Sequence, residues 1–95
     1  MAKTFTPHRL RIINELRYGL SNAEIAKRLN TNEKNIKWHL TNIYKGLGVN
    51  SRLKLYVLIA QLRLNQDDEI AYIQSKDNIK LVAVPRSTSG LSRAL

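Results

Sequence analysis

The sequence predicts a mainly α-helical fold of four helices, followed by a short C-terminal β-hairpin or an irregular extension. Two observations carry this prediction. Between residues 6 and 64, apolar residues recur at helical spacing, and capping residues divide the stretch into four parts. Beyond residue 65 the pattern changes to short runs rich in β-branched residues, which are typical of strands.

The first helix is expected to begin at Thr6, because Thr caps helices and Pro7 suits the first helical position. Gly19 should end it with a positive φ, which glycine adopts at little steric cost. Arg9 and Arg17 can each reach a phosphate or remain solvated, and the sequence favours neither reading. The apolar positions, spaced by three, three and four so that they share one face, are Leu10, Ile13, Leu16 and Leu20.

A capping box opens the second helix. Ser21 can cap it, and Glu24, three residues later, can bond back to the N–H of the cap. Asn30 follows the last apolar residue, and Asn tolerates the left-handed conformation that ends a helix. Asn32 can then cap the third helix, so the two helices should be joined by a tight turn.

The third helix is expected to have two distinct faces. Its apolar stripe follows spacings of four, three and four, and Gly48 should end it in a Schellman-type cap. The opposite face and its flanks carry lysines, a hydroxyl group, an amide and an indole. The stripe is Ile36, Leu40, Ile43 and Leu47, and the polar side is Lys34, Lys37, Trp38, Thr41, Asn42 and Lys45.

This polar side suits the major groove of DNA. Lysines neutralise phosphates or reach guanine acceptors, Asn and Thr can read base edges, and an apolar ring can contact a thymine methyl group. The alternative is an ordinary solvated amphipathic helix. A large aromatic residue opposite the apolar stripe, Trp38, argues against that alternative, unless Trp38 folds onto a neighbouring helix.

The fourth helix is expected from Asn50 or Ser51 to about Leu64, and it is apolar on two sides. One stripe should face the other helices, and the second, about 180° away, requires another partner. That partner is either the same helix of another copy or the C-terminal segment of the same chain. The first stripe is Leu55, Leu58, Ile59 and Leu62, and the second is Leu53, Val57, Ala60 and Leu64.

Residues 65–95 are interpreted as an extension. A polar linker over 66–69 precedes a possible β-hairpin over 70–84, and residues 86–95 resemble a flexible tail. The competing prediction is a short helix over 68–74. A two-stranded hairpin alone is marginal in water, so it should pack on the fourth helix or pair with another chain.

The chain has a formal net charge of +9, and all of this excess positive charge lies in the first two thirds of the sequence. Residues 1–64 hold twelve Lys or Arg against three Glu, whereas residues 65–95 hold four residues of each sign. A basic domain with a neutral appendage favours nucleic acid over an acidic protein as the partner. We expect the ninety-five residues to form one domain, with no room for a separate sensor domain.

Other function classes find little support in the sequence. The chain has no cysteine, which fits an intracellular protein without disulfides or thiolate chemistry. His8 and His39 alone make no zinc site, and no acid–base pair, nucleophile or phosphate-cradling glycine loop indicates an enzyme. We expect no catalytic residue, metal, cofactor, small-molecule ligand or membrane segment, and a cytoplasmic location in a bacterial or phage-type setting.

Many residues between positions 5 and 64 fit one known arrangement. They are Thr6-Pro7, Gly19-Leu20-Ser21-Asn22, Glu24-Ile25-Ala26, Leu29, Glu33-Lys34, Lys37, His39-Leu40, Asn42-Ile43, Leu47-Gly48-Val49 and Ser51-Arg52. In these residues the stretch resembles the LuxR-type, or GerE-like, helix-turn-helix domain. Arg9 and Arg11 stand where that family commonly has glutamates, and Glu15 and Thr31 where it usually has apolar residues.

The resemblance implies a four-helix DNA-binding domain over residues 1–64, whose third helix enters the major groove and whose fourth helix dimerises through the second stripe. Together with the polar side of the third helix, it predicts a sequence-specific regulator of transcription that binds double-stranded DNA as a homodimer. Phosphate contacts are expected from Ser21, Asn22, Lys34 and Lys45, and base contacts from Lys37, Trp38, Thr41 and Asn42. The family's base-reading positions fall on Lys37, Trp38 and Thr41.

Two alternatives remain at this point. One is a module that contacts RNA polymerase and a promoter element together, as the C-terminal domains (region 4) of sigma factors do. The other is a protein-interaction module in which the C-terminal extension captures a partner.

Overall fold

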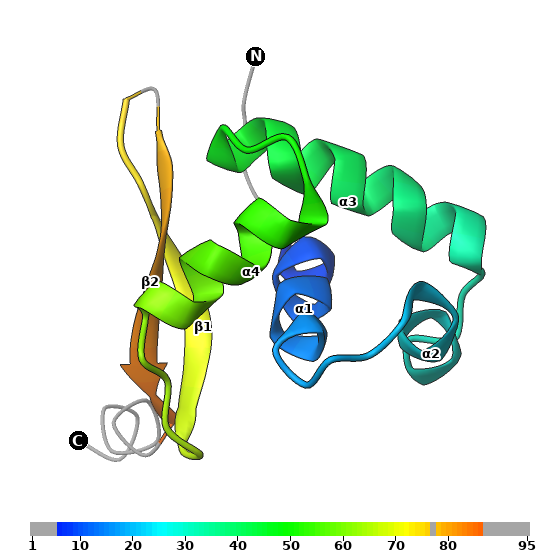
Figure 1. Ribbon diagram of the computed structural model, residues 1–95, viewed down its shortest axis with the longest axis horizontal. Helices are drawn as coiled ribbons and strands as arrows, with labels where there is room; N and C mark the ends of the chain where they lie inside the picture. Colours follow the sequence, from blue (N-terminus) through cyan, green and yellow to red (C-terminus); the bar gives the residue numbers. More distant parts are fainter. Residues whose placement is uncertain (1–5, 77, 87–95) are drawn as a thin grey trace.

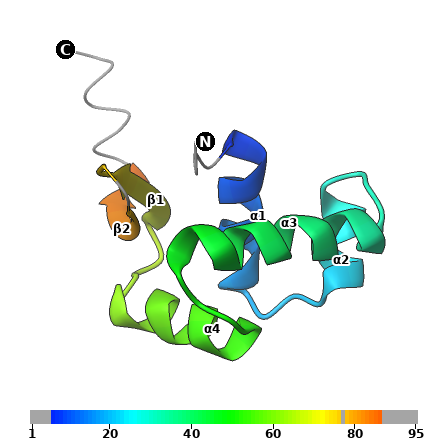
Figure 2. The ribbon, with the colours of Figure 1, turned by 90° about the horizontal axis from the view of Figure 1, so that it is seen from above.

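The computed structural model describes residues 6–76 and 78–86, which form four helices and a two-stranded antiparallel hairpin (Figure 1). The elements are α1 (Pro7–Leu16), α2 (Asn22–Arg28), α3 (Glu33–Leu47), α4 (Arg52–Gln61), β1 (Asp68–Gln74) and β2 (Ile79–Pro85). Seen from above (Figure 2), α3 spans the molecule from α2 at one end to α4 and the hairpin at the other. The expected tail lies outside the described residues, apart from Arg86.

The helix ends follow the capping residues of the sequence. The Ser21 hydroxyl accepts from the N–H of Glu24 at 3.1 Å, and the Glu24 carboxylate accepts from the N–H of Ser21 at 2.8 Å, which completes the capping box. Asn30 and Gly48 have φ values of 59° and 71°, the left-handed conformation predicted for both. After Gly48, the next N–H reaches the Tyr44 carbonyl at 3.0 Å and closes the Schellman cap.

One hydrophobic core joins the helices and the hairpin. The predicted apolar stripes of α1 and α3 lie in it, and so do side chains from both strands. Its buried members are Ile12, Ile13, Leu16, Ile25, Ala26, Ile36, Leu40, Ile43, Leu55, Ile59, Ile70, Ile79 and Leu81. The hairpin therefore packs into the same core as the helices.

Two polar residues at positions where the resemblance leads us to expect apolar ones find partners nearby. Glu15 is only 8% exposed, and its carboxylate forms an ion pair with Arg28 of α2. The Thr31 hydroxyl accepts a hydrogen bond from the Asn35 amide at 2.9 Å. Because a buried charge is costly unless it is paired, the Arg28 partner explains how α1 accommodates a carboxylate on its inner side.

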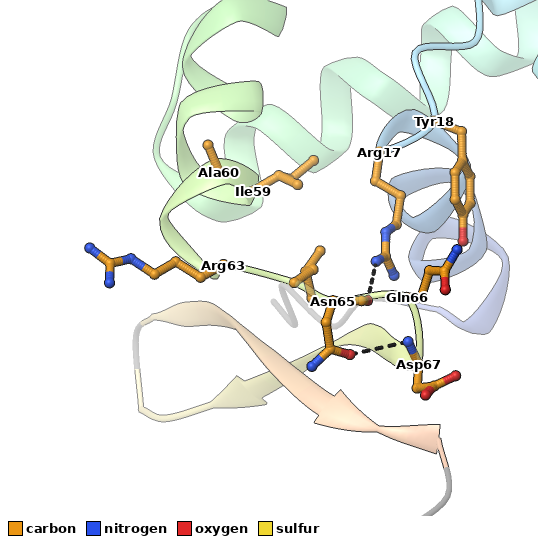
Figure 3. A pocket seen from close by; sticks show the side chains of 9 residues that line it. Arg17, Tyr18, Ile59, Ala60, Arg63, Asn65, Gln66 and Asp67 are labelled. Atoms are coloured by element: carbon orange, nitrogen blue, oxygen red, sulfur yellow. Dashed lines mark hydrogen bonds between the residues drawn. The ribbon is translucent and has the colours of Figure 1, made fainter.

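Side chains of α1 anchor the hairpin. Asn14 donates to the Ile70 carbonyl at 3.0 Å and accepts from the Ile70 N–H at 2.8 Å. Arg17, less than one turn further on, donates to the carbonyls of Asn65, at 3.0 Å, and of Asp68. Figure 3 shows the Arg17 side chain pointing toward Asn65. As a result, β1 lies against α1 and β2 against α3. The sequence led us to expect packing on the fourth helix or pairing with another chain, and Ile59 of α4 does share the core with Ile79 and Leu81 of β2.

The hairpin is longer than the sequence indicated. It spans residues 68–85 rather than 70–84, with Asp68 opposite Pro85. The competing prediction of a short helix over 68–74 is wrong, because these residues form β1. The bonds from α1 to the backbone of residues 65, 68 and 70 hold this segment extended, and no local sequence signal announces them.

The fourth helix is shorter than predicted. It ends at Gln61 rather than near Leu64, and Arg63 takes a left-handed φ of 51°. This change of direction brings Leu64 back against the core. The assignment of Leu64 to the second stripe of α4 is therefore wrong.

We expect Asn14→Ala to loosen the hairpin while the helices stay folded. The substitution leaves the N–H and carbonyl of Ile70, a residue that is 1% exposed, without a side-chain partner. Each buried unsatisfied group costs about 1–3 kcal/mol. In hydrogen-exchange measurements, β1 amides should exchange faster and α3 amides at the same rate. Asn35→Ala is the control, since it removes a hydrogen bond remote from the hairpin. If Asn14→Ala accelerated amide exchange equally in α3 and β1, Asn14 would not be an anchor of the hairpin.

Candidate nucleic-acid interface

The polar side of α3 faces solvent, as its periodicity predicts. Its inward stripe is buried at Ile36, Leu40 and Ile43. Trp38 keeps 58% of its surface exposed, and Asn42 is half-buried. The other exposed members of the polar side are Lys34, Lys37, Thr41 and Lys45.

Two side chains of this face are held by their own helix. The Thr41 hydroxyl donates to the Lys37 carbonyl at 3.1 Å, and the Asn42 amide donates to the Trp38 carbonyl at 2.9 Å. Each keeps an oxygen that can accept, and the Asn42 amide keeps a second N–H. Within the described part of the chain, no ion pair or hydrogen bond engages the lysine side chains of this face, which leaves their ammonium groups available to anions.

The start of α2 is fixed by an arginine that the sequence reasoning did not single out. Arg52, the first residue of α4, donates to the Asn22 side-chain oxygen and, at 2.7 Å, to the Leu20 carbonyl. Its Nε lies 3.3 Å from the Tyr56 hydroxyl. The Asn22 amide nitrogen is thereby left to donate, and the Ser21 hydroxyl, which accepts as a cap, still has its proton. The only available signal for Arg52 was its presence in the matched Ser51-Arg52 pair.

A cluster of rings joins α1 to the middle of α3. The Arg9 guanidinium carbon lies 5.5 Å from the centre of the Trp38 ring, and its Nε donates to His39 Nδ1 at 3.4 Å. The His39 ring stands edge-on to Trp38 at 5.0 Å and to His8 at 4.8 Å. Partial burial, and then the nearby His8 and Arg9, lower the pKa of His39, which favours the neutral ring that can accept from Arg9.

The described surface also has an open hollow away from the polar side of α3. It lies between α1, the end of α4 and residues 65–67 (Figure 3). Arg17 at its wall is already bonded to backbone carbonyls, so the reading in which Arg17 reaches a phosphate finds no support. Among the described residues there is no group of three His, Asp or Glu that could hold a metal, and no helix there is long and apolar enough to cross a membrane.

The pair α2–α3, with its tight turn and exposed basic second helix, defines the class of helix-turn-helix DNA-binding domains. Residues 3–59 match the model of the family described as bacterial regulatory proteins, luxR family. The chain belongs to this family, and the resemblance noted over residues 5–64 is confirmed as far as residue 59. It is thus a LuxR-type DNA-binding domain from a family of transcription regulators.

One curated relative shows the extent of the likeness. The chain is 40% identical over 58 residues to the nitrate/nitrite response regulator protein NarP of Escherichia coli (strain K12). The aligned part covers 61% of this chain and 27% of NarP, so the chain matches only about a quarter of that protein's length. No solved structure matches the chain significantly.

Proposed function

We propose that the chain binds double-stranded DNA sequence-specifically as a homodimer and thereby regulates transcription. The observation that carries the proposal is the exposed side of α3, where lysines and an indole lie opposite a stripe that is buried at Ile36, Leu40 and Ile43. An α-helix with its side chains is about 10–12 Å wide and the major groove about 12 Å, so the helix fits the groove. Lys37, Trp38 and Thr41 lie within about one turn of each other and reach neighbouring base edges.

The remaining polar residues have backbone-contacting roles in this proposal. Lys34 and Lys45 stand near the two ends of α3, where a helix seated in the groove approaches the flanking strands. Ser21 and Asn22 offer a hydroxyl and an amide donor to a phosphate at the start of α2. Asn42 is the remaining base-contacting candidate, through its second N–H and its oxygen.

Dimerisation is assigned to the outer side of α4. Leu53 and Val57 are 72% and 48% exposed, and Ala60 beside them is exposed as well. The exposure of these side chains shows that the hairpin does not cover them. Two-fold pairing of α4 would present two α3 helices about 34 Å apart, one turn of DNA, which increases discrimination because a single small module buries little DNA surface.

Selection of bound duplexes from a random DNA pool tests the proposal. We expect an enriched sequence with two inverted half-sites, centred about 10 base pairs apart. Affinity for the enriched site should fall steeply with salt, since lysine contacts release counterions from the DNA. No enrichment, together with salt-independent binding, would overturn the proposal.

Lys37 and Lys45 are expected to differ in their contributions. Lys45→Ala should weaken binding to all duplexes and reduce the salt slope by about one, as a phosphate contact does. Lys37→Ala should also relax the sequence preference, because its ammonium reaches base acceptors. Repeating the pool selection with both variants measures this difference. If both variants select the same sequence as the unmodified chain, Lys37 contacts only phosphate.

A further inference from the structure

Arg9 is held in place by three neighbours on its own helix and on α3. Its guanidinium stacks over Trp38, its Nε bonds to His39, and the His39 ring is supported in turn by His8. A long side chain fixed at both its Nε and its face loses little further rotamer freedom when it binds a ligand. Arg9 therefore has the character of a pre-organised binding group rather than a freely solvated arginine.

The free part of Arg9 is its two terminal nitrogens. No acceptor among the described residues bonds to them, so four N–H donors of the guanidinium fork are available. This planar fork matches the oxygens of a phosphate, to which Arg binds in a bidentate manner. The group is thus suited to an anion rather than to an apolar surface.

The position of Arg9 decides which part of DNA it meets. It lies beside Trp38, on the polar side of α3, but it projects from α1 and so stands at the margin of that side. Because the groove is hardly wider than the helix it admits, a group beside the helix lies against the sugar–phosphate backbone. Base edges are reached only by the residues of α3 itself.

We propose that Arg9 of α1 is a DNA-backbone contact, pre-organised by its stacking on Trp38 and its hydrogen bond to His39. The inference rests on the proposed function, because it requires α3 to occupy the major groove. It extends the interface from α2 and α3 to α1.

The test compares two charge-removing variants of the full chain on the enriched duplex and on a scrambled one. Arg9→Gln should lower affinity for both duplexes by roughly tenfold and reduce the salt slope by about one. Arg11→Gln is the matched control, since it removes the same charge from an exposed residue of the same helix. It should leave the slope unchanged. Equal effects of the two variants would overturn the inference.

The two hypotheses fail in different ways. If Lys45→Ala reduces the salt slope and Arg9→Gln behaves as Arg11→Gln, the proposed function stands and the role of Arg9 is wrong. If the unmodified chain shows no salt-dependent DNA binding, the proposed function itself is wrong. Arg9→Lys is the control for a folding defect. Because it keeps the positive charge, the salt slope should stay the same. The affinity should fall only in part, because lysine lacks the planar fork of the guanidinium.

Pre-organisation has its own readout, because Trp38 is the chain's only tryptophan. In the DNA-free protein, Arg9→Gln should make Trp38 fluorescence easier to quench with acrylamide, whereas Arg11→Gln should not. The effects of Arg9→Gln and Trp38→Ala on DNA affinity should be less than additive in the double variant, since removal of the ring frees the guanidinium. Unchanged quenching with fully additive effects would show that Trp38 does not position Arg9.

Discussion

Replacing Trp38 by alanine is expected to weaken binding to the preferred DNA site by about 1–3 kcal/mol, roughly 5- to 150-fold. The melting temperature should hardly change. Trp38 is 58% exposed and touches Arg9 and His39 rather than the buried stripe of α3, so its removal opens no cavity in the core. The loss should be larger for the preferred site than for a scrambled duplex, because a ring against a base edge contributes to discrimination.

Tyr18→Ala provides the control for Trp38→Ala. Tyr18 is equally exposed, at 58%, but it lies beyond the end of α1, where it stacks with Arg17 near the hollow of Figure 3. Its removal should leave DNA affinity unchanged. Competition titrations on both duplexes, with thermal melting in parallel, measure the two variants. Unchanged affinity of Trp38→Ala with a much lower melting temperature would mean that the indole belongs to the core.

The helices were predictable because their signals are local. A capping box needs only residues three apart, and Ser21 and Glu24 form it as the sequence indicates. The phase of α3 follows from spacings of three and four, which fix the buried Ile36 and the exposed Trp38 on opposite sides. Gly48 ends that helix because glycine adopts the required left-handed backbone with no side-chain clash.

The features that the sequence did not reveal depend on contacts between distant residues. Asn14 bonds to Ile70, 56 positions away, and this contact helps to extend β1 beyond its apolar run. The early end of α4 involves a left-handed backbone at Arg63, a residue type that gives no such signal. Local propensity cannot register contacts of this kind, because tertiary packing overrides it.

In the candidate site, too, local patterns were predictable from the sequence and long-range contacts were not. Its α3 residues followed from periodicity, and the cap at Ser21 from a short motif. The sequence offered Arg9 as a possible phosphate contact and Arg52 as part of a matched pair, but their partners came only from the structure. Each acts across 30 positions, on His39 and on Asn22 respectively. The sequence was therefore sufficient to locate the helix that is proposed to read DNA. The contacts of the side chains around that helix could be identified only from the folded structure.

Val57→Asp is expected to convert a dimer into a folded monomer. Val57 is 48% exposed on the outer side of α4, so an aspartate there stays solvated in the monomer and costs the fold little. In a two-fold interface the same residue lies near its own copy, and two buried carboxylates would oppose association. Binding to the inverted site should weaken because the two half-sites are then occupied independently, while binding to a single half-site should change little.

Ile73→Asp is the matched control for the dimer prediction, since Ile73 is another exposed aliphatic residue, at 58%, but lies on the hairpin. Sedimentation alongside circular dichroism should show a dimer for the unmodified chain and for Ile73→Asp, and a helical monomer for Val57→Asp. Dissociation caused by Ile73→Asp instead would place the interface on the hairpin. If the unmodified chain stays monomeric at high concentration, the dimer in the proposed function is wrong. One α3 helix would then bind each half-site alone.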